Sequence, residues 1–384
     1  MSEPILIGPP PPSRHEWRAM QEFLLSRRSD ASRVETALEQ KIATVVGRPF
    51  GVAFATPTLA IEASLAALGI DRGTEVVAPA LAPIALAAAA ARVGARVLYA
   101  DVDPKSLTLR ELHASARLTS TTRAIVGCAL HGQSAGLDAL AALASRNELP
   151  LLEILWGGLG GRIGRDPVGR FGRIAVIPLG DRESPIGGGG AVCVTNDDGL
   201  AHTLRVLRNL GAVEPRNDWE RIGGITRPER RGFDGHINPL GAALACVRLE
   251  DFDATCEQLD VVFHAYLRRL AMHPDLVLPA PCIDGTVRWS HFAVRLGERY
   301  TRDDRDSIVQ GLLRHDIAAT SIGYALPLEP AFAEHHSPGD FPVAERAADR
   351  LIALPFSSML GEREIDLVCQ TLQVMIERQS IMRS

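Results

Sequence analysis

Lysine is almost absent from this chain of 384 residues. Lysine and arginine together number 41, yet Lys41 and Lys105 are the only lysines. Any chemistry that needs a lysine amine must therefore use one of these two positions. A coding preference for arginine is enough to produce such a bias, so the scarcity alone assigns no function.

Other absences narrow the class of protein. The six cysteines are scattered without a CxxC pair, which argues against a disulfide framework and a zinc site. No apolar run approaches the roughly 20 residues of a membrane span, and Met1–Pro12 lacks the basic start and apolar centre of a secretion signal. A net charge of −5 gives no excess of positive charge that would favour binding to nucleic acid or an anionic membrane. We expect a cytoplasmic protein with a small-molecule substrate, no bound metal, no nucleic acid and no membrane partner.

Hydrophobic residues make up 46% of the chain, enough for the cores of two or three domains. From Gln40 to Asn196, short β-branched runs alternate with alanine-rich segments. The expected strands are Val52–Ala55, Glu75–Ala78, Ala95–Ala100, Arg123–Cys128, Leu151–Ile154, Ile174–Ile177 and Ala191–Val194, and the helices between them include Thr58–Leu68, Ile84–Val93 and Gly136–Ser145. This alternation predicts an α/β fold with a mostly parallel seven-stranded sheet, covered by helices on both faces.

The pattern changes in the last third of the chain. A long helical stretch is expected from Leu240 to Met272, and after Pro279 there are a few strands and helices, such as Arg302–His315 and Glu362–Glu377. We therefore expect a large domain over residues 1–254, including an N-terminal arm, and a smaller C-terminal α/β domain over residues 255–384.

Several phrases of the sequence match a known family in order. They include Gly73-Thr74-Glu75-Val76, Tyr99-Ala100-Asp101-Val102-Asp103, His131-Gly132-Gln133, Thr195-Asn196-Asp197 and the stretch Gly339–Ala347. In these phrases the chain resembles nucleotide-sugar aminotransferases of the DegT/DnrJ/StrS type, from about residue 15 to its end. The resemblance implies a type I aminotransferase fold. It also implies a homodimer, because this family builds its active site at a two-subunit interface.

The same family holds pyridoxal phosphate through a lysine Schiff base, with an aspartate paired to the ring nitrogen. The resemblance places that lysine within Asp181-Arg182-Glu183, where there is none. The family's "EDAAQ" phrase reads Glu153-Ile154-Leu155-Trp156-Gly157, so Ile154 stands at the aspartate position and Trp156 at a small alanine.

Further cofactor positions are also substituted. Pro57 stands where a glycine N–H would face the phosphate, Pro83 at the stacking aromatic, Pro178 at a phosphate-binding serine, and Asp234 at an asparagine that reaches the partner subunit's phosphate. Proline has no N–H to offer a phosphate. Taken together, the resemblance and its gaps predict the family's fold without its catalytic lysine and with no cofactor.

Polar residues at these positions are candidates for a new site. We expect Asp181, Glu183, His131 and His236 as acid–base groups, and Trp156, Arg182, Asp234 and Gln133 as substrate-binding residues. Each has a structural alternative: Trp156 can fill the vacated core, residues 181–183 can form a solvated, self-paired loop, and a lone histidine is often structural.

Two functions remain open. The first is a repurposed enzyme, independent of pyridoxal phosphate, that acts on a sugar-like or secondary-metabolite substrate in a biosynthetic pathway. The second is a catalytically silent protein that stabilises an active paralogue or another pathway enzyme in a heteromer.

Overall fold

Seven strands form the main sheet of the computed structural model, which describes residues 4–26, 31–180, 184–213, 228–282, 284–333 and 336–382. The strands are β1 (Phe50–Phe54), β2 (Glu75–Pro79), β3 (Arg96–Ala100), β4 (Thr122–Leu130), β5 (Leu151–Trp156), β8 (Ile174–Pro178) and β9 (Ala191–Thr195). Their order is β1-β9-β8-β5-β4-β2-β3, and β9 is antiparallel to both of its neighbours while the other pairs are parallel. The predicted sheet is confirmed, and every strand lies within two residues of its expected bounds.

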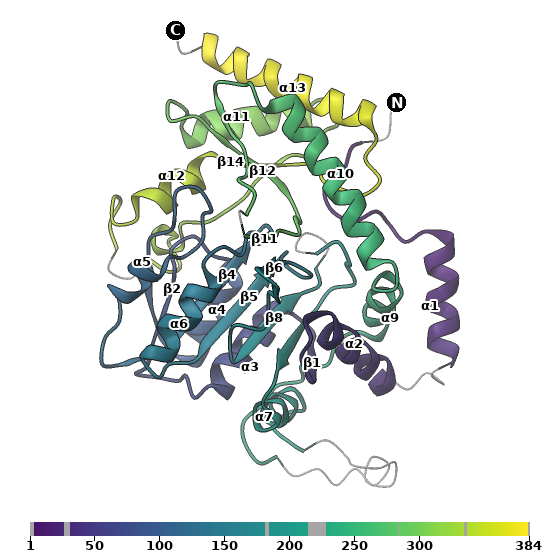
Figure 1. Cartoon of the computed structure of the whole chain (residues 1–384), viewed down its shortest axis with the longest axis vertical. Helices are drawn as coiled ribbons and strands as arrows, with labels where there is room; N and C mark the ends of the chain where they lie inside the picture. Colours follow the sequence, from purple (N-terminus) through teal and green to yellow (C-terminus); the bar gives the residue numbers. More distant parts are fainter. Residues whose placement is uncertain are drawn as a thin grey trace.

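Helices cover both faces of this sheet (Figure 1). They are α1 (Arg14–Ser26), α2 (Ala31–Val46), α3 (Pro57–Ala67), α4 (Ile84–Val93), α5 (Glu111–Ser115), α6 (Leu137–Arg146), α7 (Asp198–Arg208) and α9 (Pro239–Arg248). The expectation of one long helix from Leu240 to Met272 is wrong, because the chain turns between the end of α9 and the start of α10 (Phe252–Leu270). Leu249 caps α9, and the N–H of Glu250 donates to the Val247 carbonyl.

Side-chain alternation along the strands divides the core into two layers. On β5, Leu152 and Ile154 belong to the layer beneath α3 and α4, whereas Leu151 and Leu155 belong to the layer beneath α2, α6 and α9. A strand sends successive side chains to opposite faces, so Ile154 and Trp156 point to the α3 face of the sheet. Glu153 points to the other face, where it accepts hydrogen bonds from the backbone of residues 169 and 172.

A smaller antiparallel sheet follows, with strand order β10-β12-β14-β13. Its elements and those around it are β10 (Leu276–Val277), β12 (Phe292–Leu296), α11 (Arg302–Leu313), β13 (Thr320–Ser321), the 3-10 helix η1 (Leu326–Leu328), α12 (Pro342–Arg350), β14 (Leu351–Leu354) and α13 (Glu362–Ile381). A third sheet joins β11 (Gly285–Thr286) to β6 (Arg162–Ile163) and β7 (Asp166–Pro167). Figure 1 shows α10, α11 and α13 around the small sheet, above the main one.

The N-terminal arm links the small domain to the helices of the large one. Ile5 pairs with Ile317 and is buried in the core of the small domain, after which the chain leads to α1 beside α9. The predicted boundary at residues 254 and 255 falls inside α10, so the division into 1–254 and 255–384 stays a prediction.

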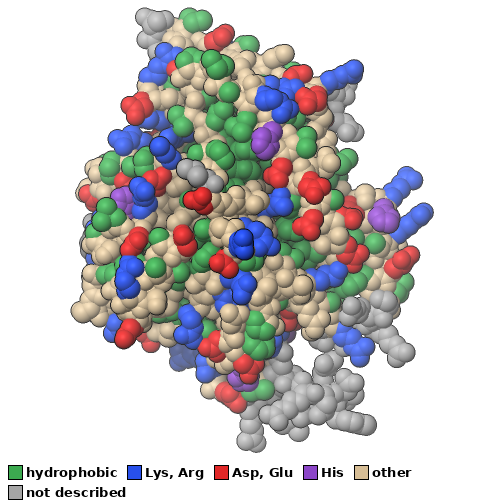
Figure 2. All heavy atoms as spheres, viewed as in Figure 1, with side chains coloured by type: hydrophobic (Ala, Val, Ile, Leu, Met, Phe, Trp, Pro, Cys, Tyr) green, Lys and Arg blue, Asp and Glu red, His purple; other side chains and the backbone are tan. Residues whose placement is uncertain are grey.

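The surface has no dominant sign of charge on the face shown in Figure 2, where acidic and basic side chains are interspersed. None of the helices in the described part of the chain combines the length and the apolar character that a membrane crossing requires.

Candidate functional site

The first region of interest lies at the N-terminus of α3 and the C-terminal ends of β5 and β8; we call it the central site (Thr56, Pro57, Ile154, Trp156 and Pro178). Ile154 is fully buried in the apolar layer beneath α3 and α4. Trp156 is half-buried and packs against the same layer. Both side chains therefore contribute apolar surface to the site, as their position on the α3 face of β5 requires.

The start of α3 offers few donors to an anion. Pro57 is the first residue of the helix and has no N–H. The N–H of Leu59 donates to the hydroxyl of Thr56 at 3.1 Å, a side-chain cap. Two of the first three amides of α3 are thus absent or already used, whereas anion binding at a helix start depends on free ones.

Neither lysine contacts the central site. Lys41 lies on α2, which packs on the opposite face of the sheet from α3, and its Nζ is 3.0 Å from Glu250 Oε1. Lys105 lies on the loop after β3 and lines another cavity, described next.

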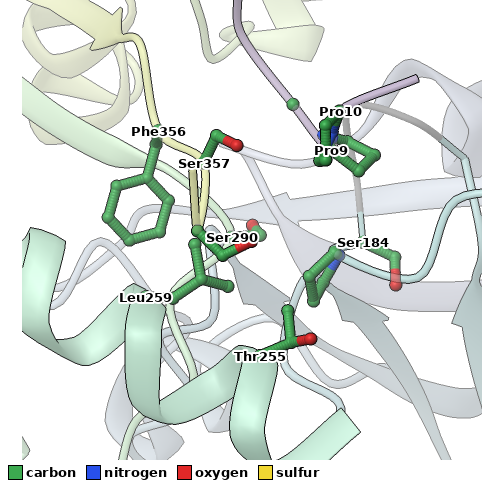
Figure 3. Close-up of a pocket in the computed structure, with 11 residues that line it drawn as sticks. Pro9, Pro10, Ser184, Thr255, Leu259, Ser290, Phe356 and Ser357 are labelled. Atoms are coloured by element: carbon green, nitrogen blue, oxygen red, sulfur yellow. The ribbon is translucent and has the colours of Figure 1, made fainter. Parts of the chain in front are cut away.

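Two cavities in the described part of the chain bear on the site, and both are lined by residues of the large and the small domain. The hydroxyl pocket, of about 320 Å³ including its open mouth, is lined by Pro9 and Pro10 of the arm, by α10 and by four serines, which are Ser184, Ser290, Ser357 and Ser358. Figure 3 shows the two prolines on one side and Phe356, Ser357 and Ser290 facing them. The lateral pocket, of about 520 Å³ including open space, is lined by Lys105, His131, Gln133, Arg295 and mainly apolar side chains.

Ser290, in the wall of the hydroxyl pocket, is paired with the adjacent His291. Ser290 Oγ and His291 Nδ1 are 2.9 Å apart, and the His291 side chain is buried. An imidazole bonded to a hydroxyl can hold or transfer its proton. Sequence reasoning missed this pair; the available signal was a Ser-His dipeptide, which the structure places directly before β12.

His131 stands behind that pair. Its ring meets the His291 ring edge-to-face, with centroids 5.2 Å apart. The next residue, Gly132, has a φ of +98°, and a Cβ there would lie 2.1 Å from the Arg288 carbonyl oxygen. A side chain at position 132 would therefore separate the loop after β4 from the small domain and part the two histidines.

The His131 imidazole is enclosed. Both ring nitrogens are shielded from solvent and have no hydrogen-bond partner within the described residues. Burial lowers the pKa of His131 to about 4, so the ring is neutral at pH 7. An unsatisfied neutral imidazole beside a cavity is a place where a ligand can gain a hydrogen bond.

His236 lies elsewhere and has firm partners. Its Nδ1 is 2.9 Å from Glu35 Oε2, and Glu35 also faces Arg208 at 3.2 Å. Arg208 additionally binds Glu39, whose pKa is raised by burial although Arg208 opposes that shift. His236 is therefore part of an ion-pair network that ties α2 to the end of α7.

The predicted site residues thus separate into several places. Asp181, Arg182 and Glu183 lie outside the described residues; the described chain resumes at Ser184, which lines the hydroxyl pocket. Asp234 is exposed, and the Gly235 carbonyl accepts the Ala55 N–H beside the central site.

Gln133 is buried in the wall of the lateral pocket. Its Nε2 donates to the Ala280 carbonyl and its Oε1 accepts the Ala135 N–H. Both ends of this amide are therefore engaged with the protein's own backbone. Across the described ranges, no cluster of three metal-binding side chains is present.

Comparison with known proteins places this geometry in context. Residues 13–373 match the model of the DegT/DnrJ/EryC1/StrS aminotransferase family. The chain is 32% identical to the erythromycin biosynthesis sensory transduction protein EryC1 of Saccharopolyspora erythraea, over 82% of each chain. It is 29% identical to a UDP-2-acetamido-2-deoxy-3-oxo-D-glucuronate aminotransferase of Pseudomonas aeruginosa, over 88% of this chain and 89% of that one.

Among solved structures, PseC of Helicobacter pylori, an aminotransferase involved in the biosynthesis of pseudoaminic acid, is similar with a TM-score of 0.87. The likeness covers 98% of this chain and 100% of that one, at 17% identity. At that identity the likeness establishes the fold, which is the predicted type I aminotransferase fold.

Proposed function

The chain belongs to the DegT/DnrJ/EryC1/StrS aminotransferase family, and on that premise we propose that it is a repurposed cytoplasmic enzyme that works without pyridoxal phosphate on a sugar-like substrate. The observation that carries the proposal is the hydroxyl pocket, which Ser290 lines, together with His291, whose Nδ1 lies 2.9 Å from Ser290 Oγ. The family's relatives include an aminotransferase named for a nucleotide-sugar substrate, which supports a role in a sugar-modifying biosynthetic pathway.

The central site does not fit pyridoxal phosphate. The cofactor needs a lysine amine, but Lys41 is bound to Glu250 on the other face of the sheet and Lys105 belongs to the lateral pocket. Its ring nitrogen needs an acidic partner, and Ile154 is apolar and fully buried. Its phosphate needs amides, and Pro57 and the capped Leu59 supply none at the start of α3. Three independent requirements are unmet, which supports chemistry of another kind.

A polyhydroxylated substrate suits the hydroxyl pocket. Ser184, Ser290, Ser357, Ser358 and Thr255 bring hydroxyl groups to it, and each hydroxyl can both donate and accept a hydrogen bond. Ser184 and Ser357 are buried, so their hydroxyls exchange few bonds with bulk water. Sugar hydroxyls have the same dual character and can pair with such groups.

Proton transfer is the chemistry that these residues allow. The Ser290 hydroxyl reaches the pocket, and His291 can take or return its proton through Nδ1. His131 packs on the His291 ring and holds it in place. From the sequence, we propose Asp181 and Glu183 as further acid–base groups and Arg182 as a substrate contact.

The alternative function is a silent partner of an active paralogue. Trp17 and Leu25 of α1 and Leu240 of α9 are large apolar side chains exposed by 52%, 78% and 56%. Exposed apolar groups on neighbouring helices favour an assembly surface, which suits both a homodimer and a heteromer.

A cofactor test comes first. Purified protein incubated with pyridoxal phosphate and then with borohydride should show no visible aldimine band and no stoichiometric adduct on Lys41 or Lys105 by peptide mass spectrometry. A stoichiometric adduct that Lys105→Gln removes and Lys41→Gln does not would overturn independence from the cofactor.

A reconstituted pathway distinguishes the enzyme from the silent partner. We expect Ser290→Ala and His291→Asn, and likewise alanine at Asp181, Glu183, His131 or His236, to lower product formation by about 10²–10⁴-fold where the side chain transfers a proton. Circular dichroism must show each variant to be folded. If all these variants form product normally while Trp17→Asp or Leu240→Asp abolishes it, the silent-partner function is correct.

A further inference from the structure

The lateral pocket has the construction of a second small-molecule site, independent of the proposed function. It lies between the loops that follow β2, β3 and β4 on one side and strands β12 and β14 on the other. Its body is apolar, formed by side chains such as Leu81, Leu107, Leu130, Leu278, Trp289 and Leu351.

Two cationic side chains, Lys105 and Arg295, line the pocket beside these apolar residues. Arg295 extends from β12, and its Nη1 donates to the Pro104 carbonyl at 3.1 Å. Lys105 is the next residue after Pro104, so the bond holds a guanidinium beside the lysine's loop. Both side chains line the same cavity although they come from different domains.

Neither cation has an acidic partner in the described part of the chain. All ion pairs found there involve other residues. Asp103 is the acid nearest to Lys105 in the sequence, but its Oδ2 lies 3.2 Å from Arg110 Nη1 and its Oδ1 accepts backbone hydrogen bonds from its own loop. Burial lowers the pKa of Arg295, and the positive charges of Arg350 and Arg346 lower it further, against an opposing contribution from Glu298.

A half-buried guanidinium near like charges and without a carboxylate in ion-pair distance is costly. A ligand can supply the missing negative charge, and Arg and Lys are the usual contacts of carboxylates and phosphates. His131 adds an unsatisfied neutral imidazole to the wall of the same cavity.

We propose that the lateral pocket binds a small ligand with an apolar body and one anionic head, a carboxylate or a phosphate monoester, with the head between Lys105 and Arg295. The apolar body lies against Leu130, Trp289 and Leu351, where each square ångström removed from water contributes about 25 cal/mol. The head replaces the absent acidic partner of the two cations.

The scarcity of lysine makes a direct test possible. Reductive ¹³C-methylation of the full chain keeps the lysine charge and gives signals from Lys41, Lys105 and the α-amino group. Lys105→Gln and Lys41→Gln assign the two lysine signals. The probes are octanoate, octyl phosphate and the uncharged 1-octanol.

We expect octanoate or octyl phosphate to shift the Lys105 signal in a saturable manner while the Lys41 signal stays fixed. Lys105→Gln should weaken binding about five- to tenfold, measured by calorimetry, and Lys41→Gln should leave it unchanged. Arg295→Gln should weaken it about tenfold, and because Arg295 also bonds Pro104, its folding is checked by circular dichroism. The relative affinities of octanoate and octyl phosphate identify the head group.

Two outcomes would overturn the proposal. The first is that 1-octanol binds as tightly as the charged probes, which would mean that the cations contribute nothing. The second is that neither charged probe moves the Lys105 signal below millimolar concentration. These measurements do not use activity, so they succeed or fail independently of the hydroxyl pocket and its proposed chemistry.

Discussion

The central site and the lateral pocket lie along the same edge of the main sheet, and they differ in what surrounds their polar groups. At the central site, the end of β5 contributes Ile154 and Trp156, both packed into the layer beneath α3. At the lateral pocket, the segment after β4 contributes His131 and the loop after β3 contributes Lys105, beside Arg295 of the small domain. One region has apolar side chains where the resemblance implies cofactor contacts, and the other holds charges without acidic partners among the described residues.

This difference means that the two regions respond differently to a change of charge. Filling a site with apolar side chains stabilises the fold, whereas a half-buried guanidinium such as that of Arg295, with no ion pair among the described residues, weakens it. The central site therefore resembles ordinary core, and the lateral pocket resembles a binding site. Four predictions test the contrast, in order of decreasing expected effect.

Replacing Ile154 with aspartate should give the largest effect. Ile154→Asp introduces the residue that the family's motif has, but into a fully buried apolar layer, so we expect a loss of at least about 4 kcal/mol in the free energy of unfolding. Urea denaturation measures it, and Ile154→Val, at about 1 kcal/mol, is the control. A well-tolerated aspartate would show that the central site is open and wet.

The free energy of unfolding should depend on pH in a way that shows whether the His131 imidazole is buried in the folded state. Its pKa is lowered to about 4 in the folded state, against about 6.5 in the unfolded chain. Between these values the unfolded state binds more protons, so stability is full above pH 6.5 and falls as the pH drops toward 4, by on the order of 3 kcal/mol.

His131→Asn is the variant for this measurement, because His131 has a φ of +56° and asparagine tolerates that conformation. Urea denaturation at pH 7 and pH 4.5 should show a smaller loss for this variant than for the wild type. His202→Asn removes an exposed imidazole of α7 and should reproduce the wild-type slope. An unchanged slope in His131→Asn would mean that the imidazole is not enclosed.

Trp156→Ala should have an intermediate effect. A fully buried tryptophan costs about 3–5 kcal/mol on truncation, and since Trp156 is half-buried, we expect about 2 kcal/mol. Trp17→Ala, at a side chain exposed by 52%, should change stability by less than about 0.5 kcal/mol. Equal values for the two variants would show that Trp156 does not support the core.

Lys105→Gln should have the smallest effect on stability. Lys105 is exposed and forms no ion pair within the described chain, so its removal should change the free energy of unfolding by less than about 0.5 kcal/mol. Lys41→Gln removes an exposed pair with Glu250 and should cost a similarly small amount. A loss above about 1 kcal/mol in Lys105→Gln would assign Lys105 to the structure instead of to a ligand.

The fold was largely predictable because its signals are local. The seven strands of the main sheet follow from short β-branched runs between alanine-rich segments, and the opposite orientations of Glu153 and Ile154 follow from strand periodicity. The break between α9 and α10 was not predicted, because helical propensity on both sides of Leu249–Asp251 conceals a turn that tertiary packing imposes.

The candidate site was predictable only in part. The resemblance directed attention to His131, Gln133, Trp156, Asp234 and His236 as one site, but the structure gives each different surroundings: His236 belongs to the Glu35–Arg208 network, whereas His131 meets His291. Family alignment reports which residues replace one another and says little about new partners that arise after substitution.

By itself, the sequence determined the order of strands and helices, the face on which Ile154 lies and the scarcity of lysine, since each depends on residue identity or on spacing of a few positions. Tertiary structure alone decided that Arg295 bonds the loop of Lys105, at Pro104, 191 residues away in the sequence. It also decided that the ring of His291, which is paired with Ser290, packs against the ring of His131. Such contacts depend on how the small domain docks on the edge of the main sheet. That docking results from apolar packing summed over many side chains, which has no period in the sequence.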